Sequence, residues 1–442
     1  MNTIHEAVER IRTGQLTPTE LVGDCLARIE KLDSEIHAWV RVDAKGALRC
    51  AAERTDQAVR GEWMGPLHGI PVGIKDIIDV GGWPTEAGSP LRADHLATKD
   101  ATLVRALRRS GAIILGKTVT TEFASFDPPP TRNPWNTDAT PGGSSSGSAA
   151  AVATGMCLAA IGTQTGGSIT RPASYCGIAG CKPTFGLVSL EGIVPFAYHL
   201  DHPGPMTRCV RDLAMMLNVI ASDREVDFVA GLEAERTAPR LGIPETFFLE
   251  ECDAAMGESI RMARERLEAA GSEVRVVGLP DLFADVLEQH RRIMEVEGAE
   301  YHRHCFLRQS DQYSPAIASL IEAGLSCQAV DYAAALAHQR AFRQQMATCL
   351  VGFDALLTPA APSAAPQRLD TTGDPKFNSP WTHSGLPTVS IPCGLTPEGM
   401  PTALQLVGAA HHERQLLATA LWCEEVLDFK ETPAGGESSE AG

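Results

Sequence analysis

Two segments rich in glycine and serine constrain this chain more than any other feature, and both lie within residues 141–172. The sequence there reads PGGSSSGSAAAVATGMCLAAIGTQTGGSITRP. Small residues predict a tightly packed helix at 148–155, and a short apolar strand follows before the second loop. Both loops offer hydroxyls and backbone N–H groups with almost no side-chain bulk. This combination suits a site where the backbone must approach a reacting carbonyl group closely.

Helix and strand signals alternate along the rest of the chain. An apolar run at 69–80 predicts a buried strand, and Asp100 is a candidate cap for a helix that Gly111 ends. A further strand is predicted at 113–116, while no strand is predicted at 201–205, which holds two prolines. The alternation indicates an α/β fold.

Composition argues against several classes of protein. The net charge of −17, with no offsetting basic run, disfavours a nucleic-acid-binding surface. No apolar stretch reaches the length of a membrane span, and the first residues show no basic segment followed by an apolar one, so we expect a cytoplasmic protein. The twelve cysteines are expected to be reduced thiols. Cys176 and Cys181 lack the second ligand pair of a zinc site, so no metal is predicted there.

Three kinds of chemistry use loops of this composition. A phosphate cradle is disfavoured because the Gly-Lys-Ser/Thr ending of such loops is missing. A nucleophile elbow is the second possibility, since 143–147 reads GSSSG with Ser145 at its centre, which would make the chain a carboxylesterase. An elbow follows a strand directly, whereas 136–141 reads as a loop. The third possibility is a serine nucleophile activated by a lysine.

Lys75 is the candidate base for the third possibility. It lies within the apolar run GIPVGIKDIIDV, an unusual setting for a lysine. A lysine accepts a proton only when it is neutral, and burial lowers its pKa toward neutral pH. The alternative is a lysine at a strand end whose amine reaches solvent.

Three long motifs favour the third possibility, a serine activated by a lysine. They are LHGIPVGIKD at 67–76, PGGSSSGS at 141–148 and TGGS at 165–168. Shorter ones are CKPTFG at 181–186, GPMTR at 204–208 and SGLP at 384–387. Ser168 follows Ser144 by 24 residues. In order and spacing, these motifs resemble the amidase signature family over residues 65–208 and 355–426.

The resemblance implies the fold of that family, a mixed, twisted β-sheet with helices on both faces in one large α/β domain. We expect this domain to span residues 1–431, followed by a disordered polar tail at 432–442. Its expected parts are an N-terminal helical wrap at 1–64, the catalytic core at 65–210, a variable substrate-shaping region at 211–352, and a segment completing the core at 353–431.

The resemblance also implies a catalytic triad, with no metal and no organic cofactor. Ser168 would attack the amide carbonyl, Lys75 would be the base, and Ser144 would relay the proton between them. The peptide bond joining Gly143 to Ser144 would be cis. Water would then hydrolyse the acyl-enzyme at Ser168 and release the acid.

Backbone N–H groups of the second loop would form the oxyanion hole in this scheme. Its members are Thr165, Gly166 and Gly167, together with Ser168 itself. One such donor typically contributes about 3 to 4 kcal/mol of transition-state stabilisation.

Arg171 departs from the usual pattern of the family. Many members read GSDTGGSIR, whereas this chain reads GTQTGGSITR, with Gln164 replacing the acid and the arginine one position later. The pattern is similar to malonamidase-like members, in which the matching arginine binds a substrate carboxylate. Arg171 and Gly143 are therefore the predicted substrate-binding residues, with a structural arginine as the alternative. The predicted substrate is a small linear amide, acid-bearing if Arg171 has this role, of the malonamate or carboxybiuret type.

The expected partners follow from the same resemblance. We expect a small-molecule amide substrate, a homodimer, and neither nucleic acid nor membrane as a direct partner. The alternative is that the chain is the amidase component of a tRNA-dependent amidotransferase, which works in a complex and passes ammonia to another component.

Overall fold

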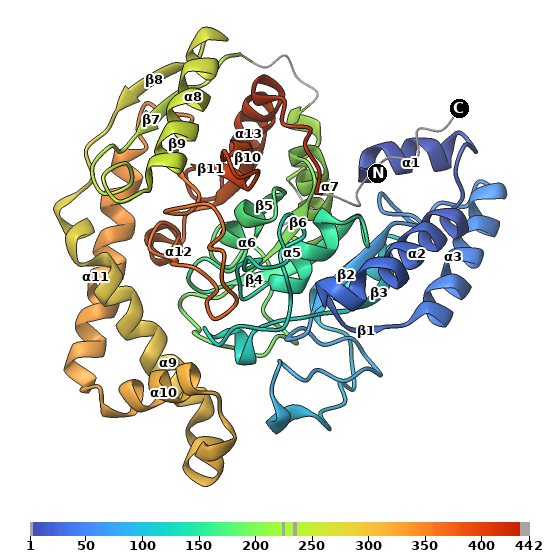
Figure 1. Cartoon of the computed structure of the whole chain (residues 1–442), viewed down its shortest axis with the longest axis horizontal. Helices are drawn as coiled ribbons and strands as arrows, with labels where there is room; N and C mark the ends of the chain where they lie inside the picture. Colours follow the sequence, from blue (N-terminus) through green and yellow to red (C-terminus); the bar gives the residue numbers. More distant parts are fainter. Residues whose placement is uncertain (1–2, 223–225, 233–236, 434–442) are drawn as a thin grey trace.

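The computed structural model describes residues 3–222, 226–232 and 237–433, so most of the predicted disordered tail lies outside the described residues. One eleven-stranded sheet runs through the molecule (Figure 1). In spatial order its strands are β1 (Trp39–Val42), β3 (Ile113–Thr118), β2 (Pro71–Lys75), β4 (Ala159–Gln164), β6 (His202–Thr207), β5 (Ala179–Lys182), β10 (Thr388–Leu395), β11 (Pro401–Val407), β9 (Ala355–Pro359), β7 (Arg240–Ile243) and β8 (Glu273–Val276).

The sheet mixes parallel and antiparallel pairs. β2 pairs in parallel with β3 and β4, and β7 pairs in parallel with β8 and β9. The pairs in the middle of the sheet, from β4 through β6, β5, β10 and β11 to β9, are antiparallel. The predicted mixed α/β fold with helices on both faces is confirmed.

Helices account for most of the remaining regular structure. The α-helices are α1 (Ile4–Arg12), α2 (Pro18–Ile36), α3 (Ala44–Val59), α4 (Thr102–Arg109), α5 (Ser146–Ala153), α6 (Thr170–Tyr175), α7 (Val210–Ile220), α8 (Ala254–Ala269), α9 (Val286–Gln309), α10 (Pro315–Ser326), α11 (Ala329–Cys349), α12 (Ser379–Ser384) and α13 (Glu413–Leu427). Short 3₁₀ turns occur at Pro90–Arg92, Glu122–Ala124, Ala230–Leu232, Asp281–Asp285 and Ser310–Gln312. None of the helices in the described part combines the length and apolar character needed to cross a bilayer.

The helices α9, α10 and α11 form a cluster outside the sheet. The chain leaves the sheet after β8, builds these three helices, and returns to it at β9. α10 and α11 both pack against α9, and Figure 1 shows the three together at one side of the molecule. This cluster lies within the region 211–352 that carried no motif.

The small residues of α5 are explained by close packing of backbone on backbone. All eight residues of α5 are buried. A Cβ added to Gly147 would lie 2.2 Å from the carbonyl oxygen of Ala38 and 2.4 Å from the backbone nitrogen of Val119. No side chain fits in that space, so this turn of the helix requires glycine. The first loop is thereby held against the sheet.

Two local predictions are wrong. Asp100 does not cap α4; its carboxylate accepts a 2.7 Å hydrogen bond from the backbone N–H of Gly81, and Ala101 occupies the cap position without a side-chain bond. Residues 202–207 form β6 despite Pro203 and Pro205. β5 pairs only with the last two residues of β6, so both prolines lie where the strand has a partner on one side only, a position that tolerates proline.

Candidate active site

Lys75 is the last residue of β2, and its side chain is fully buried. Its amine donates hydrogen bonds to the hydroxyls of Ser144, at 2.7 Å, and Thr163, at 2.8 Å. Burial lowers the pKa of Lys75 well below its ordinary value, and the charge of Asp201 opposes this shift. The interpretation of Lys75 as a strand-end lysine that reaches solvent is therefore wrong. The amine is held in an environment that favours its neutral form.

Ser144 lies two residues before the start of α5, and the peptide bond that joins it to Gly143 is cis, as the resemblance implies. The neighbouring serines have structural hydrogen bonds. The hydroxyl of Ser145 donates to the carbonyl of Thr163 and accepts from its N–H, both at 3.2 Å. Ser146 donates to the carbonyl of Gly142 at 2.7 Å. Because Ser145 is fully buried and both bonds use its hydroxyl, it is not presented as a nucleophile.

The second loop joins β4 to α6 and carries Ser168. The side-chain carbonyl of Gln164 accepts the N–H groups of Ile169 and Thr170, at 2.9 and 3.0 Å, and so caps the start of α6. Thr382 donates to the carbonyl of Gly166 at 2.7 Å. The residue that replaces the acid of the family pattern thus holds the loop in shape.

Several polar groups of this loop make no hydrogen bond within the described part of the chain. Among the described residues, the backbone N–H groups of Gly166, Gly167 and Ser168 have no hydrogen-bond partner, and neither does the Ser168 hydroxyl. Ser168 is 8% exposed, whereas Ser144 is 1% exposed. Catalytic hydrogen bonds in enzymes without substrate are often incomplete. The step from Ser168 to Ser144 therefore stays a prediction, as does the oxyanion hole.

Asp201 is a residue of this site that the sequence interpretation missed. Its carboxylate accepts a 2.6 Å hydrogen bond from the hydroxyl of Thr165, and bonds of 2.8 and 3.1 Å from the N–H groups of Phe196 and Ala197. Burial raises the pKa of Asp201 to about 6. It stands shortly before the GPMTR motif, but among prolines that pointed to a loop.

Arg171 lies on α6 and is 1% exposed. One guanidinium nitrogen donates to the carbonyl of Gly143 at 2.8 Å and to the hydroxyl of Thr372 at 3.3 Å. Its other two nitrogens have no hydrogen-bond partner in the described part of the chain. The structure therefore joins the two predicted substrate-binding residues to each other, and carboxylate binding by Arg171 stays a prediction.

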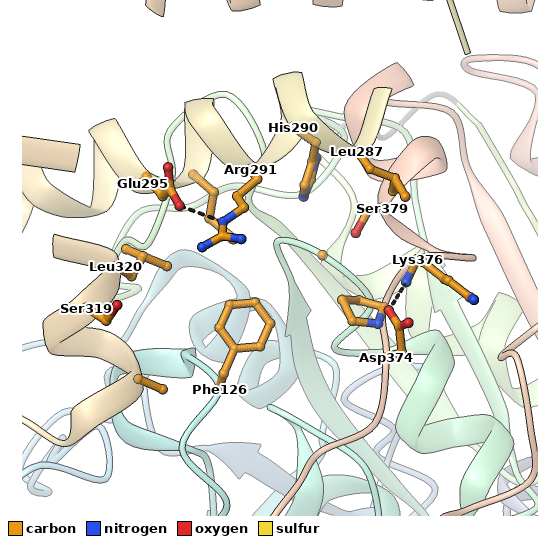
Figure 2. A pocket seen from close by; sticks show the side chains of 14 residues that line it. Phe126, Leu287, His290, Arg291, Glu295, Ser319, Leu320, Asp374, Lys376 and Ser379 are labelled. Atoms are coloured by element: carbon orange, nitrogen blue, oxygen red, sulfur yellow. Dashed lines mark hydrogen bonds and ion pairs between the residues drawn. The ribbon is translucent and has the colours of Figure 1, made fainter. Parts of the chain in front are cut away.

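A cavity of about 500 Å³ opens beside the second loop and reaches Gly166 (Figure 2). Its walls come mainly from α9 and α10, which lie in the region expected to shape the substrate pocket, and from the segment Asp374, Pro375 and Lys376.

One group of possible metal ligands occurs among the described residues, at His5, Cys209 and Asp212. The two carboxylate oxygens of Asp212 accept the N–H groups of Ile4 and His5 at 2.6 and 3.0 Å. The position of this carboxylate is therefore explained by its two bonds to the backbone at the start of α1.

Comparison with known proteins identifies the relatives of the chain. The amidase family profile matches residues 20–417. The A subunits of glutamyl-tRNA(Gln) amidotransferase from Alkaliphilus metalliredigens and Geobacter metallireducens are 34% and 33% identical to it. The first alignment covers 95% of each chain, and the second covers 98% of this chain and 99% of the relative.

Solved structures agree with this assignment. A crystal structure of an amidase is 33% identical, with a TM-score of 0.88, and covers 96% of this chain and 99% of that chain. The peptide amidase from Stenotrophomonas maltophilia is 30% identical, with a TM-score of 0.86 and 98% coverage of both chains.

The prediction of a homodimer is wrong. The relatives that match over nearly their whole length are, by name, subunits of an amidotransferase. The motifs behind the prediction describe buried loops around a reaction centre, and such loops carry no information about the surface through which a chain associates. They do report the chemistry. The chain belongs to the amidase signature family, whose members hydrolyse amides.

Proposed function

We propose that this chain hydrolyses a linear amide to an acid and ammonia through an acyl-enzyme at Ser168. The hydrogen bond of 2.7 Å between the Lys75 amine and the Ser144 hydroxyl carries the proposal. A neutral amine at this position can take the Ser144 proton while Ser144 takes the proton of Ser168. The freed Ser168 oxygen forms a bond to the amide carbon, and the carbonyl oxygen becomes an anion.

The backbone N–H groups of Gly166, Gly167 and Ser168 would stabilise that anion. They have no partners among the described residues. The loop that carries them is fixed by the bond that Gln164 accepts from Ile169 and the bond that Thr382 donates to Gly166. The carbon–nitrogen bond then breaks, and the leaving nitrogen receives the proton from Lys75 by way of Ser144. Water then attacks the acyl carbon while its proton passes through Ser144 to Lys75. The bond between the acyl carbon and the Ser168 oxygen breaks, and the proton returns from Lys75 through Ser144 to Ser168, which releases the acid.

Labelling with a fluorophosphonate followed by peptide mass spectrometry tests this assignment. We expect the adduct on Ser168, and none in the Ser168→Ala variant. An adduct on Ser145 would replace the proposal with the carboxylesterase interpretation, and absence of any Ser-dependent adduct together with absence of ammonia release would remove it.

We further propose that the chain works as the amidase component of a multi-subunit enzyme that uses the ammonia it releases. Support comes from the relatives that are, by name, A subunits of an amidotransferase, and from the nearly complete coverage of both chains. Affinity purification of the tagged chain from its own host, followed by mass measurement of the intact complex, tests this. A defined stoichiometric complex with a different chain is expected, and an isolated chain with full amidase activity contradicts it.

A second candidate is an amidase that releases ammonia directly to solvent. The cavity beside Gly166 favours it, because a volume of about 500 Å³ with largely apolar walls is suited to a bulky amide. Full turnover of such an amide by the isolated chain would support this candidate over the multi-subunit enzyme.

A further inference from the structure

The cavity beside Gly166 is lined by apolar side chains and by a few polar ones. Its large apolar side chains are those of Phe126, Leu287, Met294 and Leu320. Figure 2 shows Phe126 and Leu320 facing the helix α9 across the cavity. Gly166 lies two residues before Ser168 in the second loop, so a molecule bound here lies beside the loop that carries the proposed nucleophile.

Each charged group on the cavity wall already has a partner. Arg291 pairs with Glu295 at 2.6 Å, and Lys376 pairs with Glu251, outside the cavity, at 2.8 Å. The carboxylate of Asp374 accepts the backbone N–H of Lys376 at 2.9 Å. Arg291 uses only its Nε in this pair, and its side chain is 72% exposed. An ion pair with so exposed a cation contributes only about 0 to 1 kcal/mol, which does not offset the cost of moving a carboxylate into a largely apolar cavity.

His290 is a buried polar residue of the cavity wall. It is 3% exposed, and neither ring nitrogen has a hydrogen-bond partner in the described part of the chain. Figure 2 shows its ring pointing from α9 into the cavity. Buried polar groups are nearly always paired, so an unpaired imidazole facing a cavity indicates a ligand group that completes it.

Packing fixes the position of the His290 ring, and burial keeps the ring uncharged. Its ring packs edge to face against His383, with 5.9 Å between centroids. His338 donates from Nε2 to the carbonyl of Leu282 at 3.0 Å, so its Nδ1 accepts the 3.1 Å bond from Nε2 of His383. Burial lowers the pKa of His290 to about 4. At neutral pH, His290 therefore offers one donor and one acceptor and carries no charge.

We infer that the cavity binds the acyl part of a neutral carboxamide with a bulky apolar body, and that His290 hydrogen-bonds a second uncharged polar group on it. This inference rests on the proposed amide hydrolysis by Ser168, in the form of the second candidate that releases ammonia to solvent, and it specifies which amide is hydrolysed. Acid-bearing amides of the malonamate type and zwitterionic glutamine are the disfavoured substrates.

A panel of five amides tests the inference. It comprises propanamide, 3-phenylpropanamide, N-acetylphenylalaninamide, succinamate and glutamine. We expect kcat/KM for 3-phenylpropanamide to exceed that for propanamide by at least about tenfold, because an apolar pocket discriminates by buried apolar surface. N-acetylphenylalaninamide, which carries a second amide group, is expected to be the best substrate, and succinamate and glutamine the poorest.

Two variants with matched controls locate the effect. Ala316→Phe fills the cavity from α10 and is expected to abolish the preference for 3-phenylpropanamide over propanamide. Ala334→Phe makes the same change at an exposed residue of α11 and is expected to keep it. His290→Phe is expected to lower the kcat/KM ratio of N-acetylphenylalaninamide to 3-phenylpropanamide about tenfold, and His304→Phe, exposed on the same helix, to leave it unchanged.

Calorimetric binding to the Ser168→Ala variant separates this inference from the proposed function. Tighter binding of 3-phenylpropanamide than of propanamide, lost in Ala316→Phe, supports the cavity assignment even if no amide is turned over. Equal binding and turnover of all five amides, or a preference for glutamine or succinamate, overturns the inference and leaves hydrolysis by Ser168 intact. Hydrolysis that persists in Ser168→Ala overturns the proposed function instead.

Discussion

The carboxylate of Asp201 accepts a 2.6 Å hydrogen bond from the Thr165 hydroxyl, which ties the start of β6 to the loop that carries Ser168. The same carboxylate raises the pKa of Lys75, against the larger lowering caused by burial. One buried acid therefore acts on both the proposed base and the proposed oxyanion hole.

Replacing Asp201 by asparagine is expected to move the acidic limb of the kcat/KM profile to lower pH. The amide still accepts the Thr165 hydrogen bond, but the negative charge that favours protonated Lys75 is gone. Lys75 then becomes neutral at a lower pH. A pH profile for a neutral amide measures the shift, with Asp311→Asn, at an exposed residue, as the control. An unchanged limb, or a shift to higher pH, contradicts the coupling.

The same substitution is expected to change how stability depends on pH. The pKa of Asp201 is about 6 in the folded chain and 3.8 as its ordinary value. The folded state binds this proton more tightly than the unfolded state does. The contribution of Asp201 to the free energy of unfolding is therefore largest below pH 4 and falls by about 3 kcal/mol at most as the pH rises to 6. Asp201→Asn is expected to lack this component in urea unfolding at pH 4 and pH 7. Parallel curves for both proteins would contradict it.

Lys75 and Lys117 form a matched pair, both buried and lying on the adjacent strands β2 and β3. Lys75→Met is expected to lower kcat about 10²- to 10⁴-fold, because the base is lost. Its unfolding free energy is expected to change by only about 1 kcal/mol, since no buried charge loses a partner. Ammonia release and urea unfolding measure the two effects.

Lys117→Met is expected to give the opposite result. Lys117 pairs with the buried carboxylate of Asp76 at 2.7 Å, so removing it costs about 3 to 5 kcal/mol. The kcat of the remaining folded protein is expected to stay near the normal value. If Lys75→Met unfolds the chain while Lys117→Met inactivates it without unfolding, the roles assigned to the two lysines are reversed.

Arg171→Lys tests carboxylate binding against support of the first loop. Because the guanidinium is buried and bonds the carbonyl of Gly143, we expect kcat to fall by a similar factor for acid-bearing and neutral amides. A lysine amine on a flexible chain does not hold the fixed position from which one nitrogen of the planar guanidinium bonds both Gly143 and Thr372. Kinetics with succinamate and propanamide measure this. A rise in KM confined to succinamate would instead establish the carboxylate role predicted from the sequence.

Gly147→Ala is expected to destabilise the chain by about 1 to 3 kcal/mol or more, because the added methyl meets backbone atoms that cannot move aside. Gly23→Ala, in α2, meets nothing within 4 Å and is expected to stabilise the chain by about 0.5 to 1 kcal/mol. Thermal unfolding of the two variants should shift in opposite directions. Equal shifts would show that α5 does not depend on close packing.

The parts of the site predicted from the sequence are those encoded by short segments. A run of glycines and serines is enough to predict available backbone donors. The apolar run around Lys75 left open whether its amine is buried or reaches solvent, and the resemblance to the family favoured the buried position. The hydrogen bond from Lys75 to Thr163 depends on the parallel pairing of β2 with β4, which no single motif reports.

The parts that were missed depend on tertiary contacts. Asp201 is 36 residues from Thr165 in sequence, and no periodicity links them. β6 was missed because its prolines are tolerated only where β5 stops short, and the sequence does not report where a neighbouring strand ends. His290 looks like an ordinary helix residue until the cavity beside it is known.

The excursion of the chain between β8 and β9 separates two tasks. Its helices supply the walls that contact the body of an amide, whereas Lys75, Ser144 and Ser168 belong to segments that precede it. A new preference among amides can therefore arise from substitutions within one continuous segment of the sequence, while the proposed catalytic residues stay unchanged.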